Sequence, residues 1–252
     1  MKKVLCAIPC YNESVNLSNL FKDLKANRVF DFADILFVDD CSTDNSVEMI
    51  KQFGYQVIEH KKNGGYGEAI QSAFTHAENN NYQSFIVFPG DGQRSAKDLV
   101  HLIQLDQESR FDVISGSKFH IYSDRYGPIH RRIGNRIYAA IAKIGWNCPI
   151  KDVLSGFKIY RVDSVKKFFG VLPKGYPFDI CFSMYAARFN LNVTEVDVDC
   201  RYDEHTSKMN SVLWVSFKML MHLIYHFVMQ PRIVKATNES LMLRESSIKK
   251  AS

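Results

Sequence analysis

The chain has 252 residues and a net charge of +5. Hydrophobic residues make up 46% of it and charged residues 23%, ordinary globular values that exclude a disordered or fibrous chain. The length suits one large α/β domain, and the small positive charge suits phosphates or anionic lipid while disfavouring a nucleic-acid-binding protein. The six cysteines form no CxxC pair, so we expect reduced thiols in a cytoplasmic protein.

Two periodicities alternate along the first half of the chain. Short runs rich in Val, Ile and Phe alternate with polar stretches of helical period, which is the pattern of βαβ units around a parallel sheet. Strands are predicted at residues 4–9, 35–39, 56–59, 85–89 and 113–117, and helices at 16–26, 44–53, 67–79 and 96–105. A second region has predicted helices at 131–145 and 178–189 and strands at 157–160 and 193–200.

Residues 211–229 are strongly apolar, but Lys218, His222 and His226 recur there every four residues. One polar stripe on an apolar cylinder disfavours a membrane-spanning helix and favours an amphipathic helix lying in an interface. That interface is either a membrane surface, helped by the basic tail that follows, or a core or homo-oligomer contact. The pattern divides the chain into a main domain, residues 1–210, and an interface helix with a basic tail, residues 211–252.

Acidic residues collect where predicted strands end. Glu13 follows the first strand, Asp39 and Asp40 close the second, and Asp91 lies between two glycines after the fourth. The carboxyl ends of parallel strands line the ligand crevice of an open α/β sheet. Carboxylates are costly to bring together there unless a base, a ribose or a metal uses them. For Asp39 and Asp40, capping of the next helix is the alternative role.

A glycine-rich stretch, Asn-Gly-Gly-Tyr-Gly-Glu at residues 63–68, precedes a predicted helix. It lacks the Gly-Lys-Ser/Thr ending of a P-loop and does not form GxGxxG at the first strand–helix turn. ATP hydrolysis and dinucleotide binding therefore lose their main support. Such a helix start either accepts a diphosphate or makes a tight turn.

Six motifs occur in the order found in a known family. They are Pro9-x-Tyr11-Asn12-Glu13, Val38-Asp39-Asp40-x-Ser42-x-Asp44, Asn63-Gly64-Gly65-x-Gly67, Gly90-Asp91-Gly92-Gln93, Gly116-Ser117-Lys118 and Ser155-Gly156-Phe157-Lys158. Over about residues 3–210 the chain resembles family 2 glycosyltransferases of GT-A fold, and it is most similar to the branch that acts on polyprenyl (dolichyl) phosphate. The resemblance implies a Rossmann-like, open, mostly parallel sheet flanked by helices. It also implies an inverting transfer of sugar from a nucleotide-diphosphate donor to polyprenyl phosphate, with Mg²⁺ or Mn²⁺.

The resemblance also implies roles for individual residues. Those matching the family's donor site are Pro9, Tyr11, Glu13, Asp39, Asp40, Gly67, Gly90, Asp91 and Lys208. Asp91 and Gln93 match the metal position, and Asp91, Asp179 and Arg201 the catalytic positions. The acceptor phosphate is expected at Lys118, Arg131, Arg132 and Asn135. The chain departs from the family at Pro89, where the Asp-x-Asp motif has its first aspartate.

Three functions remain open at this level. A phosphate acceptor is already anionic and needs no strong base, which suits a peripheral enzyme on the inner face of the cytoplasmic membrane. Transfer to a saccharide hydroxyl needs a base, for which Asp179 is the candidate, its alternative role being a helix N-cap. Pro89 motivates the third, a non-catalytic nucleotide-sugar-binding protein.

Overall fold

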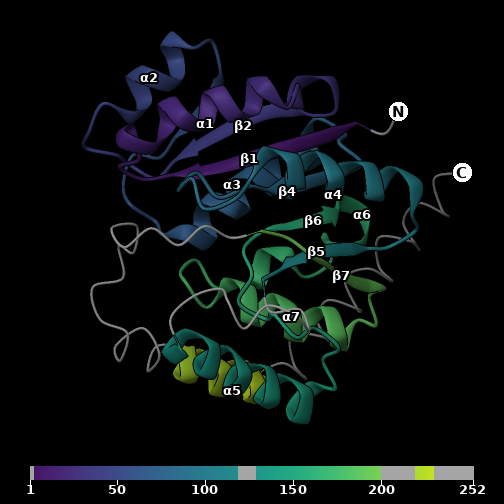
Figure 1. Cartoon of the computed structure of the whole chain (residues 1–252). Helices are drawn as coiled ribbons and strands as arrows, with labels where there is room; N and C mark the ends of the chain where they lie inside the picture. Colours follow the sequence, from purple (N-terminus) through teal and green to yellow (C-terminus); the bar gives the residue numbers. More distant parts are fainter. Residues whose placement is uncertain (1–2, 119–128, 200–218, 230–252) are drawn as a thin grey trace, which may run out of the picture.

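The computed structural model describes residues 3–118, 129–199 and 219–229. In this part of the chain a seven-stranded sheet has the order β3-β2-β1-β4-β6-β5-β7 (Figure 1). Its strands are β1 (Val4–Cys10), β2 (Asp34–Asp39), β3 (Gln56–Glu59), β4 (Ser84–Val87), β5 (Val113–Ser117), β6 (Lys158–Arg161) and β7 (Val193–Asp197). The pairs among β1 to β4 are parallel, as is β5 with β7, whereas β6 runs antiparallel to β4 and β5. The mostly parallel sheet predicted from the sequence is confirmed.

The predicted helices are present with small shifts at their ends. They are α1 (Ser14–Ala26), α2 (Ser46–Gln52), α3 (Tyr66–Asn79), α4 (Ala96–Glu108), α5 (Ile129–Trp146), α6 (Val162–Val165) and α7 (Phe178–Arg188), with 3₁₀ turns η1 (Val29–Asp31) and η2 (Phe169–Val171). The helix expected from residue 44 begins at Ser46, because the Asp44 carboxylate accepts the Ser46 amide before the first turn. The strand expected at 85–89 ends at Val87, before Pro89, which has no amide hydrogen for a ladder bond.

Both faces of the sheet are covered. Alternate residues of β1 point to opposite sides, so that Leu5 and Ala7 pack with α3 and α7 while Cys6 and Ile8 pack with α1 and α4. A strand buried on both faces reads as a continuous apolar run, and this explains the β1 sequence. The two layers of helices leave the carboxyl ends of β1, β2 and β4 together at one edge of the sheet.

Residues 219–229 are helical and lie beside α5 (Figure 1). Met219 and Leu223 belong to the same core as α7, and His226 is buried, with its Nδ1 3.1 Å from the Tyr185 hydroxyl. The described part of the predicted interface helix therefore packs on the main domain; the boundary at residue 210 lies outside the described residues. No helix in the described ranges is long and apolar enough to cross a membrane.

Candidate active site

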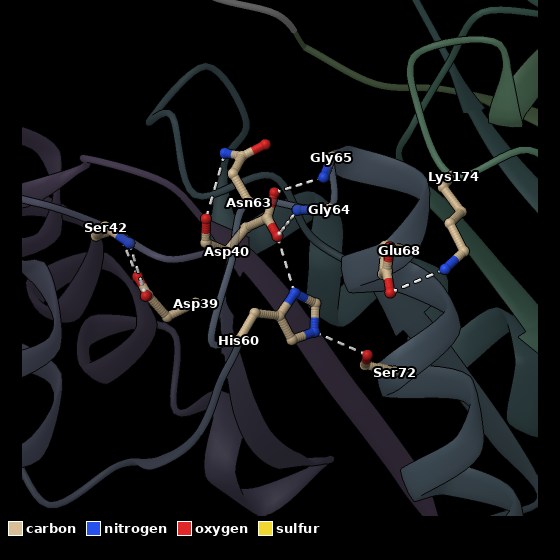
Figure 2. Close-up of polar contacts among 10 residues, drawn as sticks. All are labelled: Asp39, Asp40, Ser42, His60, Asn63, Gly64, Gly65, Glu68, Ser72 and Lys174. Carbon is tan, nitrogen blue, oxygen red and sulfur yellow. Dashed lines mark hydrogen bonds and ion pairs between the residues drawn. The ribbon is translucent and has the colours of Figure 1, made fainter.

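The loops that follow β1 and β2 are joined by side-chain hydrogen bonds. Asp39 accepts the Ser42 amide at 2.9 Å and also the Ser42 hydroxyl (Figure 2). The Ser42 hydroxyl oxygen in turn accepts the Asn12 amide at 2.9 Å. Pro9 lies beside Val38 in the sheet register. The structure thus places two predicted donor residues, Pro9 and Asp39, on adjacent strand ends.

Three other predicted donor residues lie along the same edge. Tyr11 is 41% exposed just beyond β1. Glu13 precedes α1, and its Oε2 accepts the Asn16 side-chain amide at 2.6 Å. Gly90 sits close to β1, since a Cβ there would lie 3.0 Å from the Pro9 carbonyl oxygen. The ends of β1, β2 and β4 therefore form one continuous rim.

Asp40 faces inward, toward the glycine-rich loop. Its carboxylate accepts the amides of Gly64 at 2.8 Å and Gly65 at 2.7 Å, and it lies 2.8 Å from His60 Nδ1 (Figure 2). These two amides are the groups that a diphosphate would use at such a loop. The geometry favours the tight-turn interpretation, with Asp40 as the anion that fills the loop. Donor binding by Asp40 stays a prediction.

Gly67 has a packing reason to be glycine. A Cβ at this position would lie 2.3 Å from the Pro173 carbonyl oxygen, so the first turn of α3 can approach residues 173–175 only without a side chain. The approach is completed by the Glu68 amide, which donates to Lys174 O at 2.9 Å, and by the Lys174–Glu68 ion pair at 3.1 Å (Figure 2). A donor contact of Gly67 stays a prediction.

Asp91 is the acidic side chain at the end of the β4 segment. Gly92 beside it has a φ of +73°, which suits glycine, and Asp91 Oδ1 accepts the Gln93 amide at 3.0 Å. Burial raises the pKa of Asp91, although the charges of Arg94 and Lys118 act in the opposite direction. A carboxylate oxygen is a suitable ligand for a hard divalent cation.

The described residues contain no group of three His, Cys, Asp or Glu side chains that could hold a metal ion by themselves. Mg²⁺ in nucleotide enzymes is commonly held by one or two carboxylates together with substrate phosphates and water. Asp91 fits this way of binding, and Gln93 lies two residues away at the same turn. Pro89, the departure from the family motif, offers no ligand oxygen on its side chain.

Asp179 forms a buried ion pair that was not predicted from the sequence. Its Oδ1 lies 3.2 Å from Lys158 Nζ, and Lys158 is fully buried at the start of β6. Because β6 is antiparallel, its first residue pairs with Val87, the last residue of β4. Lys158 also donates to the Ser155 carbonyl oxygen. Burial raises the pKa of Asp179, and Lys158 opposes that rise.

Asp179 is not the N-cap of α7, because that position belongs to Pro177. Its carboxylate is instead close to Tyr66, whose side chain lies over Gly156; a Cβ on Gly156 would lie 2.2 Å from the Tyr66 hydroxyl oxygen. Burial and the charges of Asp179 and Asp91 raise the pKa of Tyr66 well above its ordinary value. The Tyr66 hydroxyl and the Asp179 carboxylate thus both border Gly156, and the charge of Asp91 also acts on Tyr66.

The predicted acceptor residues are only partly described. The Lys118 amide donates to Asp152 Oδ2 at 3.2 Å at the end of β5. The side-chain amide of Asn135 is buried and donates to Lys151 O at 3.0 Å, and Arg132 is half-buried on α5. Arg201, Lys208 and the side chain of Arg131 lie outside the described residues.

Three residues of this site were given no role in the sequence analysis. Lys158 carried a signal, since a lysine inside the apolar run Phe-Lys-Ile-Tyr needs a buried partner. Tyr66 stands inside the glycine-rich stretch, and His60 directly follows β3, at the edge where parallel strands present side chains to ligands. Their partners come from distant segments, so their roles could not be read from spacing.

The structure thus brings predicted donor residues together at the carboxyl edge of an α/β sheet, and the comparisons show the family of the chain. The profile of the family Glycosyl transferase family 2 matches residues 6–169, so the chain belongs to that family and is a glycosyltransferase. The family expected from the motifs is confirmed.

Two relatives with similar sequences are archaeal proteins. The chain is 26% identical to an uncharacterized protein of Methanocaldococcus jannaschii over 224 residues, which cover 88% of this chain and 91% of that protein. It is 22% identical to UDP-N-acetylglucosamine–dolichyl-phosphate N-acetylglucosaminyltransferase of Methanococcus voltae, over 88% of this chain and 95% of that protein. The resemblance to the polyprenyl-phosphate branch is consistent with these relatives.

A solved structure confirms the GT-A fold. Glucosyl-3-phosphoglycerate synthase from Mycobacterium tuberculosis, in complex with Mn²⁺, UDP and glucosyl-3-phosphoglycerate, superposes with a TM-score of 0.70. The match covers 89% of this chain and 79% of that one at 14% identity.

Proposed function

We propose that this glycosyltransferase moves a sugar from a UDP-sugar to a polyprenyl phosphate, with inversion at the sugar carbon and a divalent cation. The observation that carries the proposal is the position of Asp91 beside Gly90, where a Cβ would lie 3.0 Å from the Pro9 carbonyl oxygen, on the rim formed by the ends of β1, β2 and β4. A phosphate oxygen of the acceptor attacks C1 of the sugar, and the bond from C1 to the diphosphate oxygen breaks. UDP leaves with the electron pair of that bond.

The cation belongs at Asp91 in this proposal. Mg²⁺ or Mn²⁺ supplies charge that stabilises the leaving diphosphate. Asp91 would hold the cation, with Gln93 two residues away, and the charge of Lys118 acts on the Asp91 carboxylate. Support comes from the Mycobacterium structure, which holds Mn²⁺ together with UDP.

The role of Asp179 depends on which acceptor the enzyme uses. With a phosphate acceptor no proton needs to be removed, and the Lys158-paired carboxylate orients a sugar hydroxyl. With a saccharide hydroxyl as acceptor, Asp179 is the base, and the raised pKa of its carboxyl favours proton uptake. The name of the Methanococcus relative supports the first role.

An exposed apolar surface supports the lipid acceptor. We define the apolar face as the exposed hydrophobic residues of α5 and of residues 219–229: Ile133, Ile137, Ile144, Leu220, Met221, Ile224, Tyr225, Phe227 and Val228. Neither helix contains an acidic residue, and α5 adds Arg132, Arg136 and Lys143. An apolar face bordered by cations suits anionic lipid, where each basic residue contributes about 1 kcal/mol.

Transfer is tested with radiolabelled UDP-sugars, Mn²⁺ and vesicles that carry polyprenyl phosphate. We expect label in the organic phase, loss of that label with a chelator, and a product whose anomeric configuration is opposite to the donor's. Label that appears only in a water-soluble saccharide supports the hydroxyl acceptor instead. Release of free sugar with no transfer to either acceptor contradicts both.

Membrane contact is tested by co-sedimentation with vesicles containing anionic lipid. The double variant Ile137→Ser, Ile224→Ser should lose binding, because both side chains are about half exposed on the apolar face. Val15→Ser is the control, since Val15 is 87% exposed on α1, outside the apolar face. Equal sedimentation of all three proteins argues against a membrane role of this face and leaves a homo-oligomer contact as the prediction.

A further inference from the structure

Three polar side chains form a connected row behind the glycine-rich loop. His60 Nδ1 lies 2.8 Å from Asp40 Oδ1, and His60 Nε2 lies 2.8 Å from the Ser72 hydroxyl in α3 (Figure 2). The His60 side chain is 14% exposed and that of Asp40 7%, so water competes little for these contacts. A carboxylate has no hydrogen to donate, so Nδ1 carries the hydrogen toward Asp40.

Asp40 transmits this constraint to the backbone of the loop. The same carboxylate accepts the Gly64 and Gly65 amides, and Asn63 Nδ2 donates to Asp40 O at 3.3 Å. Gly65 has a φ of +89°, a conformation that L side chains rarely adopt. The path of the loop is thus fixed by three donors on one carboxylate together with one special backbone angle.

The fixed loop leads directly to Tyr66, which lies near Asp179. Tyr66 follows Gly65 and begins α3, and its hydroxyl lies against Gly156 near Asp179. The space at the hydroxyl is tight enough that Gly156 has no room for a Cβ. A displacement of the loop backbone would therefore change the position of the Tyr66 hydroxyl relative to Asp179.

We infer that His60 and Ser72 are positioning residues for sugar transfer, which act through Asp40 and the Gly64–Gly65 amides to hold Tyr66 against Asp179. The inference rests on the proposed function in placing the reaction at Asp91 and Asp179. His60 touches no reacting group in this scheme. Its effect on the reaction depends entirely on the carboxylate that it orients.

Substitutions of His60 distinguish the contribution of Nδ1 from that of Nε2. His60→Asn keeps a donor near the place of Nδ1, His60→Gln places its amide near that of Nε2, and His60→Ala removes both. Ser72→Ala deletes one hydroxyl and is the mildest change. His101→Ala is the control, because His101 is exposed on α4.

Two readouts are taken on the full chain: hydrogen exchange at the Gly64 and Gly65 amides, and kcat and KM for UDP-sugar hydrolysis with Mn²⁺. We expect His60→Ala to speed exchange and lower kcat at least about tenfold, with KM changed less than about threefold. His60→Asn should recover more of both than His60→Gln, and Ser72→Ala should fall between wild type and His60→Ala.

Exchange and kcat within about twofold of wild type in both His60→Ala and Ser72→Ala would overturn the inference. So would equal recovery by the Asn and Gln variants, because a general packing role does not distinguish the nitrogens. Donor hydrolysis needs no acceptor and amide exchange needs no turnover. A failed transfer to polyprenyl phosphate would therefore count against the proposed function and leave this result to be decided by exchange.

Discussion

Lys158 Nζ lies 3.2 Å from Asp179 Oδ1, and this buried pair joins the antiparallel strand β6 to the first turn of α7. The direction of β6 is the reason for the contact. A parallel strand would present its carboxyl end to the edge that holds Asp91, whereas β6 presents its first residue there. The reversed strand therefore supplies a cation beneath the site, next to a carboxylate whose burial is otherwise unfavourable.

Replacing Lys158 by Met should destabilise the protein strongly. The Asp179 carboxylate would be left buried without its cation, a change that typically costs about 3–5 kcal/mol. The double variant Lys158→Met, Asp179→Asn should recover part of that loss, because no buried charge remains. Urea unfolding of the three proteins checks this, and a loss below about 1 kcal/mol in the single variant would contradict it.

Gly67→Ala should cost about 1–3 kcal/mol of folding free energy, because the new Cβ would meet the Pro173 carbonyl oxygen at 2.3 Å. Gly145→Ala is a matched control near the end of α5, where a Cβ meets nothing within 4 Å. That substitution should be neutral or slightly stabilising. Thermal unfolding distinguishes the two, and equal melting temperatures would show that Gly67 is not held by packing.

Protonation of His226 should loosen the helix at residues 219–229. Burial, with His222 adding to it, lowers the pKa of His226 from 6.5 to about 4. The unfolded chain takes up the proton first, so stability is full above pH 6.5 and falls as the pH drops from 6.5 to about 4, by up to about 1.4 kcal/mol per pH unit. Urea unfolding across this range should show a weaker pH dependence for His226→Gln; the same slope in both proteins would contradict the assignment.

Asp39→Ala should weaken donor binding more than it lowers the maximal rate. Contacts to the nucleoside act equally in the ground and transition states, so their loss raises KM, here by about tenfold. Steady-state kinetics with varied UDP-sugar measures both constants. A large fall in kcat at saturating donor would place Asp39 in the chemistry.

The sequence predicted the fold closely because both kinds of signal were strong. Alternating apolar runs and polar helical stretches located the strands, and the motif order indicated the family. The direction of β6 left no trace in the sequence, since Lys158 to Arg161 reads like any short strand. Strand direction depends on which neighbours pair, and the neighbours of β6 lie about 45 residues (β5) and about 75 residues (β4) away along the chain.

The candidate site was predicted in part. Asp39 and Asp91 are at strand ends as expected, because parallel strands share one carboxyl edge. Asp40 and Gly67 were predicted to bind the donor in the same way, yet both have internal contacts. Asp40 contacts the Gly64 and Gly65 amides, and Gly67 packs against Pro173. Spacing gives the position of a residue along a strand end, but the contact partner is set by loops that only the folded chain brings together.

The charge of Asp91 is the central element of the proposed reaction. Asp91→Asn retains an oxygen that can accept the Gln93 amide, so the fold should be preserved while the ligand charge is lost. The most direct measurement is transfer of sugar from UDP-sugar to polyprenyl phosphate at saturating donor and Mn²⁺, for wild type and this variant. The account predicts a fall of at least about 100-fold with unchanged thermal stability. Turnover within about threefold of wild type would contradict it.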